Sequence, residues 1–245
     1  MAFDRASGVL MHITSLPSPH GIGSLGQAAF DFVDFLRDAG QRYWQVLPLG
    51  HTGFGDSPYQ CYSAAAGNPL LIDLDQLVAD GLLTADEVRA ADQSWNPDQV
   101  DYVQVIASHY PLLRRAYERA QDMPQIMAAV QAFRTHAAAW IEDYALFMAL
   151  KEERFELAPL WEWSDAALLH RDPDALAAAR EELKEEIDFR VFLQTIFFTQ
   201  WGTLRAYAAN AGVRIIGDVP IYVSPDSSDV WQHPCLLYTS DAADD

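Results

Sequence analysis

The chain opens with short apolar runs on either side of one amphipathic stretch. Residues 8–13 and 43–50 are apolar and bounded by turn residues, which predicts two buried β-strands. Residues 27–40 between them predict a helix that ends at Gly40. Its apolar face is formed by Ala29, Phe32, Val33 and Leu36. The order strand, helix, strand favours a parallel sheet or barrel.

The middle of the chain has an almost wholly helical pattern. Thr84 and Glu87 have the spacing of a capping box at the start of a helix. Further helices are predicted over 101–120, 128–155 and 172–187, and Pro111 is expected to kink or break the first of them. A last helix, which ends at Gly212, has a broad apolar stripe. The stripe consists of Phe189, Leu193, Ile196, Phe197, Trp201, Leu204 and Ala208.

A third strand over 213–223 completes the pattern, so a long helical insertion separates the second strand from the third. A (β/α)8 barrel needs eight strands and about 250 residues even without insertions. We therefore expect an α/β fold that is the N-terminal part of such a barrel and is incomplete in this chain. The predicted domains are 1–74, the first two strand–helix units with a loop; 75–212, the helical insertion; and 213–234, the third strand and its loop.

Two loops carry the candidate chemistry. Gly21, Gly23 and Gly26 match the G-x-G-x-x-G pattern of dinucleotide-binding folds, but two prolines separate them from the first strand. The second strand also ends without the acidic residue that would hold a ribose, so we expect glycines that only shape a tight loop. The second loop, residues 51–74, is long and rich in aromatic and apolar residues, which favours a functional role.

Composition narrows the class of partner. Lys and Arg number 16 against 35 Asp and Glu, a net charge of −19, which argues against nucleic acid and anionic membrane surfaces. The first residues lack a basic region followed by a long apolar core, so we expect no signal peptide, and no run approaches the length of a membrane span. With two cysteines, Cys61 and Cys235, and no His/Cys cluster of zinc spacing, we expect a cytoplasmic protein without metal or cofactor.

Three blocks of sequence resemble glycoside hydrolase family 77, the amylomaltases or 4-α-glucanotransferases. They are GVLMHITSLPSPHGIGSLG, QVLPLGHTGFGDSPYQCYSAAAGNPLLIDL and RIIGDVPIYVSPDSSDVW, and the resemblance extends over residues 7–234. It implies a (β/α)8 barrel with helical subdomains. It also implies transfer of α-1,4-glucan segments to other glucans or to glucose by a retaining mechanism that uses two carboxylates.

The resemblance also assigns roles to residues. In the family the catalytic carboxylates follow later strands, so no catalytic residue is expected in this chain, and the chain alone is expected to be inactive. Asp218 matches an aspartate that binds substrate hydroxyls, and Tyr59 matches a tyrosine that stacks on a glucose ring. Ser57 fits either a sugar contact or a turn, whereas Asp56 fits a turn better.

Some features leave alternatives open. A non-catalytic α-glucan-binding module would use the same residues without chemistry, and a dinucleotide-binding oxidoreductase is a third alternative.

Residues 235–245 fit neither the family pattern nor a barrel element, and we expect them to be a non-native tail. Most of the tryptophans are expected to pack in the core or between helices: Trp140, Trp201, Trp161 and Trp163.

Overall fold

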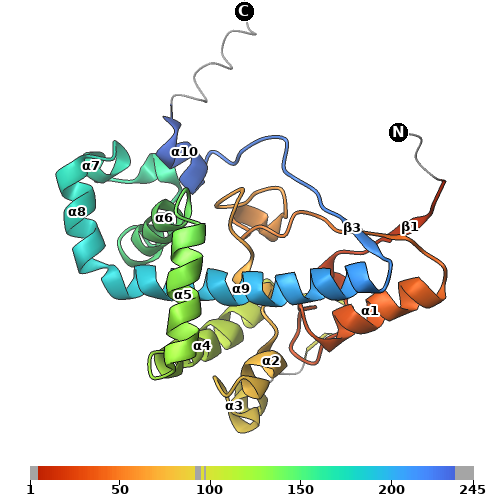
Figure 1. Ribbon diagram of the computed structural model, residues 1–245. Helices are drawn as coiled ribbons and strands as arrows, with labels where there is room; N and C mark the ends of the chain where they lie inside the picture. Colours follow the sequence, from red (N-terminus) through yellow and green to blue (C-terminus); the bar gives the residue numbers. More distant parts are fainter. Residues whose placement is uncertain (1–4, 92–94, 97, 235–245) are drawn as a thin grey trace, which may run out of the picture. The chain divides into compact units, whose positions relative to one another are not determined.

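The computed structural model describes residues 5–91, 95, 96 and 98–234, so the predicted tail and Cys235 lie outside it (Figure 1). The strands are β1 (Gly8–Leu10), β2 (Tyr43–Gln45) and β3 (Arg214–Ile216). The helices are α1 (Gln27–Asp38), α2 (Leu74–Ala79), α3 (Ala85–Ala91), α4 (Tyr102–Ala120), α5 (Pro124–His136), α6 (Ile141–Glu153), α7 (Ala166–Leu169), α8 (Pro173–Glu182), α9 (Lys184–Asn210) and α10 (Ser228–Gln232).

The chain divides into two compact units. The sheet unit comprises Met1–Leu49, Asn68–Met127 and Thr195–Val219, and the helical unit comprises Gly50–Gly67, Ala128–Gln194 and Pro220–Asp245. The domain boundaries predicted after residues 74, 212 and 234 group the chain by barrel repeat instead and stay predictions.

In the sheet unit, the described strands form one parallel sheet in the order β1-β2-β3, which confirms the predicted α/β class and the parallel pairing. Trp44 lies opposite Val9 on one side and Ile215 on the other. Each strand is only three residues long, shorter than predicted. Pro48 and Pro220 lie within a few residues of the ends of β2 and β3, and proline has no N–H to continue a ladder.

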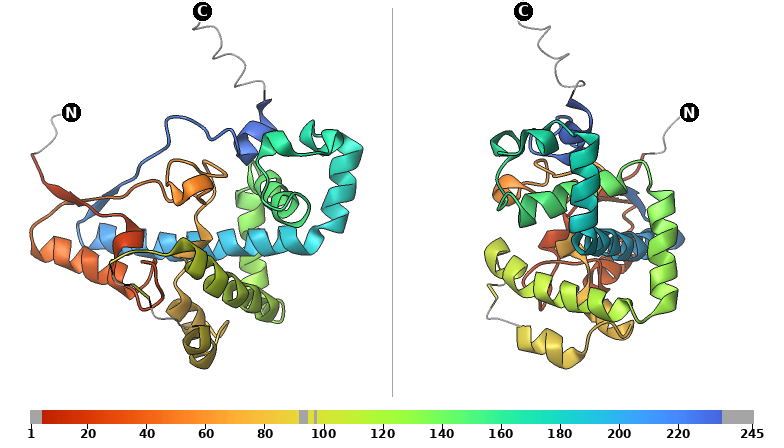
Figure 2. Two further views of the ribbon diagram at one scale, coloured as in Figure 1. Left: turned by 180° about the vertical axis from the view of Figure 1, so that it is seen from behind. Right: turned by 90° about the vertical axis from the view of Figure 1, so that its left-hand side faces the viewer.

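The core of the sheet unit lies between the strands and α1. Trp44 is fully buried, its indole N–H donates to the Met11 carbonyl at 2.7 Å, and its ring meets Phe32 edge to face. The C-terminal half of α9 lies beside α1 (Figures 1 and 2), where the Tyr207 hydroxyl donates to Asp34 at 2.9 Å. On the predicted apolar face of α1, Ala29, Val33 and Leu36 are buried, as expected.

Local signals for helix ends are confirmed. Thr84 and Glu87 form the predicted capping box, with the Thr84 N–H donating to the Glu87 carboxylate at 2.8 Å and the Glu87 N–H donating back to the Thr84 hydroxyl at 3.3 Å. Gly40 and Gly212 follow α1 and α9 with positive φ angles of 70° and 78°, as expected of helix stops.

One helix prediction is wrong and another is wrong in part. Helix α4 runs through Pro111 without the break that the sequence allowed, and the kink stays a prediction. Pro111 and Ala107, whose carbonyl loses its donor, are both exposed, so water can satisfy that carbonyl. The single helix predicted over 128–155 is instead α5 and α6. Trp140 leaves the helical conformation at the corner and packs against Phe133 and Tyr144.

The helical unit has an aromatic core around α6. Trp163 is buried and stacks on Phe155 with ring centroids 4.3 Å apart, whereas Trp161, also expected in the core, is 64% exposed. The sequence pattern could not separate them, because both lie in LWEW and only the turn that carries them decides which one faces inward.

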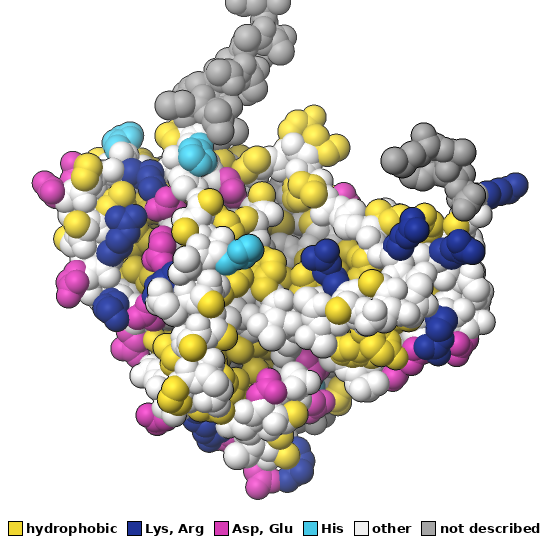
Figure 3. Space-filling view, in the orientation of Figure 1, with side chains coloured by type: hydrophobic (Ala, Val, Ile, Leu, Met, Phe, Trp, Pro, Cys, Tyr) yellow, Lys and Arg dark blue, Asp and Glu magenta, His cyan; other side chains and the backbone are white. Residues whose placement is uncertain are grey.

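The surface of the chain mixes both charges despite the acidic balance. Acidic and basic side chains lie together over α8 and around α3 (Figure 3), where Arg180 pairs with Asp143 and Arg89 pairs with Asp86. Of the helices in the described part of the chain, none is long and apolar enough to cross a membrane.

Candidate functional site

The loop of residues 50–67, in the helical unit, folds back on itself as an irregular hairpin. Isolated antiparallel bridges join Gly50 to Gly67 and Thr52 to Cys61. Across the hairpin, the Gly53 N–H donates to the Gln60 carbonyl at 2.7 Å and the Tyr62 N–H donates to the His51 carbonyl at 2.9 Å. The backbone thus forms a frame that fixes the residues at its tip.

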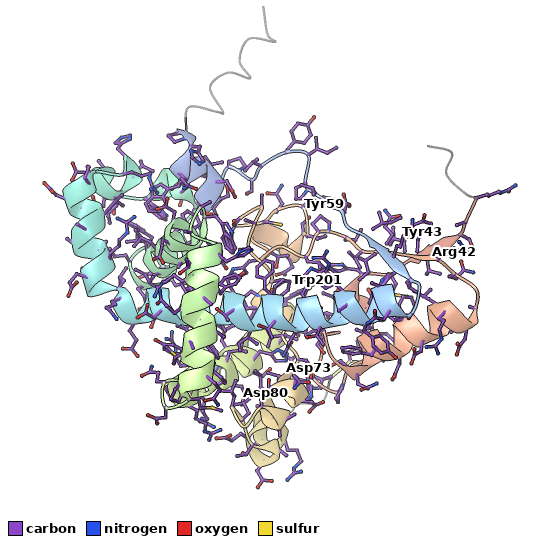
Figure 4. The ribbon with its side chains drawn as sticks, viewed as in Figure 1. Arg42, Tyr43, Tyr59, Asp73, Asp80 and Trp201 are labelled. Carbon is purple, nitrogen blue, oxygen red and sulfur yellow. The ribbon has the colours of Figure 1, made fainter. Side chains whose placement is uncertain are left out.

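Two of the predicted substrate residues lie at this tip. Tyr59 is 44% exposed (Figure 4), and its N–H donates to the Ser57 hydroxyl at 3.3 Å, so these two residues are brought together. The Ser57 hydroxyl therefore has the turn-forming role that the sequence allowed, and its sugar contact stays a prediction. Asp56 has a positive φ of 53°, in keeping with the turn expected there.

Polar side chains from the helices hold the base of the 50–67 loop. Gln194 of α9 donates to the Gly67 carbonyl at 2.9 Å and accepts from the Gly67 N–H at 2.7 Å, so it pairs with both backbone groups of one residue. His51 Nδ1 lies 2.8 Å from the Tyr144 hydroxyl. Burial, reinforced by the positive charge of Arg190, lowers the pKa of His51 to about 3, which keeps the ring neutral near pH 7.

Helix α10 holds the far strand of the hairpin. The Ser228 N–H and hydroxyl donate to the Tyr62 carbonyl at 2.8 and 3.1 Å, and Asp229 accepts from the Ala64 N–H at 2.9 Å. The conformation of this loop therefore depends on contacts with a helix more than 160 residues away in sequence.

Cys61, beside the tyrosine, is not a nucleophile. Its thiol is buried and donates to the Pro58 carbonyl at 2.9 Å. Burial, with a smaller effect of the Asp229 carboxylate, raises the pKa of Cys61 to about 11, so it stays protonated. Among the described residues, no group of three His, Cys, Asp or Glu side chains could hold a metal ion.

Asp218, the third predicted substrate residue, belongs to the sheet unit. It follows β3 by two residues, is half-buried, and its carboxylate accepts from the Val219 N–H at 2.9 Å. In parallel sheets with helical crossovers, ligands bind beyond the carboxyl ends of the strands, and Asp218 has that position.

The glycine loop, also in the sheet unit, is shaped by close packing. A Cβ at Gly23 would overlap the Ile13 carbonyl oxygen, and one at Gly26 would overlap the Asp73 carboxylate. Asp73 (Figure 4) caps α2 through the Gln76 N–H at 2.7 Å, as expected of a capping residue. The glycines thus have a packing role, and the absence of a bound nucleotide stays a prediction.

A pocket of about 580 Å³ opens over this loop, with Thr14, Ser18, Gly21, Trp95 and Gln99 among its lining residues. Within the described part of the chain its lining contains Asp98 but no lysine or arginine that would attract a pyrophosphate. At the same loop, His109 of α4 donates to the His20 carbonyl at 3.0 Å, and burial lowers the pKa of His109 to about 4.

Sequence reasoning missed two glutamines that hold these loops, Gln194 and Gln200, and the fully buried Lys151. In the sheet unit, Gln200 pairs with both backbone groups of Asp73, at 2.8 and 3.2 Å, in the way Gln194 pairs with Gly67. The signal was present, since a lone glutamine or lysine inside an apolar helical run is a buried polar residue that needs a partner. The neighbouring residues in the sequence, however, do not show which group that partner is.

Comparison with known proteins identifies the family. The family model described as 4-alpha-glucanotransferase matches residues 11–243. The chain is 48% identical to a 4-alpha-glucanotransferase of Thermus thermophilus and 46% identical to one of Streptococcus pneumoniae, in each case over 96% of this chain and 46% of the relative. The chain therefore spans about half the length of the curated relatives it matches.

The fold agrees with the sequence match. The amylomaltase from Streptococcus agalactiae, solved in complex with acarbose, superposes with a TM-score of 0.92 at 44% identity, over 95% of this chain and 47% of that one. Amylomaltase from Corynebacterium glutamicum, at 19% identity, shares the fold with a TM-score of 0.72 over 94% of this chain and 32% of that one. These matches confirm the resemblance read from the three sequence blocks: the chain belongs to glycoside hydrolase family 77, the 4-alpha-glucanotransferases.

Proposed function

We propose that this chain is the N-terminal part of a 4-α-glucanotransferase that moves segments of α-1,4-glucan between maltodextrins or to glucose with retention of configuration. The observation that carries this is the TM-score of 0.92 with an amylomaltase in complex with acarbose. In this proposal the three strands are consecutive strands of a (β/α)8 barrel, residues 75–212 form the helical insertion between the second and third, and the enzyme acts in the cytoplasm.

Tyr59, Ser57 and Asp218 bind the substrate in this proposal. The flat ring of Tyr59 covers the apolar face of a glucose unit, and its exposure of 44% leaves that face accessible to a ligand. The Asp218 carboxylate accepts hydrogen bonds from sugar hydroxyls, which are charge-assisted and therefore stronger than neutral ones.

The chemical step belongs to carboxylates that we do not assign to this chain. A retaining glycosidase needs a nucleophile and an acid/base about 5–5.5 Å apart. By the family resemblance both follow later strands, and the chain spans 46% of the length of its relatives. We therefore expect residues 1–245 to bind glucans without cleaving them.

Two measurements on the 245-residue chain test this. A coupled glucose assay should detect no glucose release from maltotriose above background, and clear release would overturn the assignment of the carboxylates. Calorimetry should detect acarbose binding, weakened about fivefold or more by Tyr59→Ala, in line with the range of about 1–3 kcal/mol for aromatic stacking on nucleic-acid bases. Trp161→Ala, which removes an aromatic ring 64% exposed on another segment, is the matched control and should leave binding unchanged.

Binding without cleavage also fits the alternative of a glucan-binding module. The reading frame of the source gene beyond Pro234 separates the two, because a transferase requires further strands that carry the carboxylates. Micromolar NAD(H) affinity that is lost on Gly23→Val would instead favour the oxidoreductase.

A further inference from the structure

Lys151 is a fully buried cation at the end of α6, in the helical unit. Its Nζ donates to the two carboxylate oxygens of Asp226 at 2.9 and 2.7 Å and to the Ala158 carbonyl at 2.7 Å, and its side chain has an exposure of 0%. These three bonds use all three N–H donors of the ammonium group. The rings of Tyr62 and Phe147 lie 5.2 and 5.8 Å from Nζ, within the range of cation–π contact.

Asp226 marks the point where an exposed segment becomes buried. Before it, Ile221 and Tyr222 are 91% and 85% exposed; after it, Ser227 and Ser228 are buried. The Asp226 carboxylate also accepts from the Leu160 N–H at 3.0 Å. The ion pair therefore anchors the chain at the entry to α10.

Helix α10 in turn holds the 50–67 loop through the carbonyl of Tyr62 and the N–H of Ala64. Tyr62 is three residues from Tyr59 and lies directly over the Lys151 ammonium. Lys151 thus reaches the loop along two routes: through Asp226 and α10, and through the ring of Tyr62.

The turn after α6 depends on the same lysine. Glu156 and Leu157 have positive φ angles of 49° and 65°, which non-glycine residues rarely adopt. The Leu157 N–H donates to the Lys151 carbonyl at 2.7 Å, and the Ala158 carbonyl accepts from Lys151 Nζ. Both the backbone and the side chain of Lys151 hold this unusual turn in place.

A buried ion pair is a poor device for stability alone. The cost of removing two charges from water often exceeds their attraction, so an apolar or neutral pair of similar volume is often as stable. This pair joins α6, the segment at the start of α10 and the ring of Tyr62, which are far apart in sequence. Its main effect is therefore to fix how these three segments meet.

We propose that Lys151 and Asp226 are a positioning pair that orders the 50–67 loop, and with it Tyr59, for glucan binding. The proposal rests on the proposed function of that loop. Neither residue contacts the sugar; they act through α10 and Tyr62.

The experiment compares Lys151→Met, Asp226→Asn and the double variant with the wild-type 245-residue chain. The readouts are the melting temperature, hydrogen exchange of backbone amides in residues 57–64, and the dissociation constant for acarbose by calorimetry well below the melting temperature. Leu176→Ala, which removes a buried side chain of α8, is the control for a general loss of stability.

We expect each single variant to melt lower and the double variant to melt close to the wild type. In the double variant, the amides of residues 57–64 should still exchange at least tenfold faster, and the dissociation constant should rise about tenfold. Leu176→Ala should lower the melting temperature without either change.

The proposal would be overturned if the double variant regained the wild-type melting temperature, loop exchange rates and affinity all together. The pair would then serve stability alone. If the wild-type chain binds no acarbose, the proposed function fails, and loop exchange alone then decides whether the pair orders the loop. If a single variant does not fold, the double variant still gives this answer.

Discussion

The loops after the first two strands differ in the contacts that hold them in place. The loop between β1 and α1 is fixed where a side chain is missing: at Gly23, the carbonyls of Ile13 and Leu16 come too close for a Cβ. The 50–67 loop is fixed by side chains that are present, such as Gln194 and Tyr144, which come from helices far along the sequence.

The difference has consequences for how each loop responds to change. At Gly23 the first loop meets the carbonyls of Ile13 and Leu16, which are close in sequence, so this position depends on local backbone geometry and should tolerate no added volume. Elsewhere the same loop also meets Asp73 and His109, which lie farther along the chain. The second loop depends on pairs 93 to 166 residues apart, so it forms only when the helical unit is folded. A loop that carries Tyr59 is thereby tied to the folding of the helices around it.

Gly23→Ala should have the largest effect on stability. The new methyl group would overlap the Ile13 carbonyl and lie 2.8 Å from the Leu16 carbonyl, and backbone atoms cannot move aside cheaply. We expect a loss of about 3 kcal/mol in the free energy of unfolding, measured by urea denaturation.

Gly202→Ala is the matched control. Gly202 lies inside α9, and no atom within 4 Å would meet its Cβ, so alanine should raise stability by about 0.5–1 kcal/mol. Equal effects of the two substitutions would show that Gly23 is not closely packed.

Gln194→Leu should destabilise the chain by about 2 kcal/mol. It keeps the apolar volume but leaves the buried N–H and carbonyl of Gly67 without partners, and each unsatisfied group has a cost. Gln200→Leu removes the corresponding pair from Asp73 and should cost less, about 1 kcal/mol, because one of its bonds is longer, at 3.2 Å.

The same urea titration measures both glutamine variants. A larger loss for Gln200→Leu would reverse the ranking, and no loss for either would mean that water replaces the glutamines at both loops.

The fold could be predicted from sequence where its causes are local. The capping box of Thr84 and Glu87, the glycine stops and the parallel strand order follow from residue spacing and cap chemistry. The uninterrupted helix at Pro111 and the corner at Trp140 could not, because exposure and aromatic packing decide them, and both depend on the folded chain.

The candidate site divides along the same line. Tyr59, Ser57 and Asp218 were proposed from motifs that resemble the family, and they stay predictions of substrate contact. Gln194 and Lys151 were not proposed, because an isolated polar residue in an apolar helix reveals that it has a partner but not which one. The contacts that hold the loop in place are therefore harder to predict than the residues at its tip.

Acid should destabilise both units, since each holds one buried histidine near its loop. Burial lowers the pKa of His51 to about 3 and that of His109 to about 4, below the usual 6.5. Each ring is neutral when folded but takes up a proton when unfolded below pH 6.5. The contribution of the two neutral rings to the free energy of unfolding is therefore full above pH 6.5. It is lost as the pH falls toward the lowered pKa values, by about 1 kcal/mol per pH unit for each histidine.

His51→Asn and His109→Asn test this separately. Each substitution should reduce the slope of the unfolding free energy against pH, between pH 6.5 and 5, by the contribution of one histidine. An unchanged slope in either variant would mean that its imidazole is already protonated in the folded chain.

Ser57 should give the smallest effect, and it separates two roles of one hydroxyl. Its oxygen accepts from the Tyr59 N–H at 3.3 Å in a solvent-facing turn, so Ser57→Ala should change the unfolding free energy by less than about 0.5 kcal/mol. Asparagine can replace serine as the acceptor in such a turn but has no hydroxyl group. If the turn alone matters, Ser57→Asn should bind acarbose as the wild type does, and Ser57→Ala should bind more weakly. If the hydroxyl contacts the sugar, as we expect, both variants should lose about threefold to tenfold in affinity, the range of one neutral hydrogen bond. Full affinity in both would remove Ser57 from the binding site and leave Tyr59 there without it.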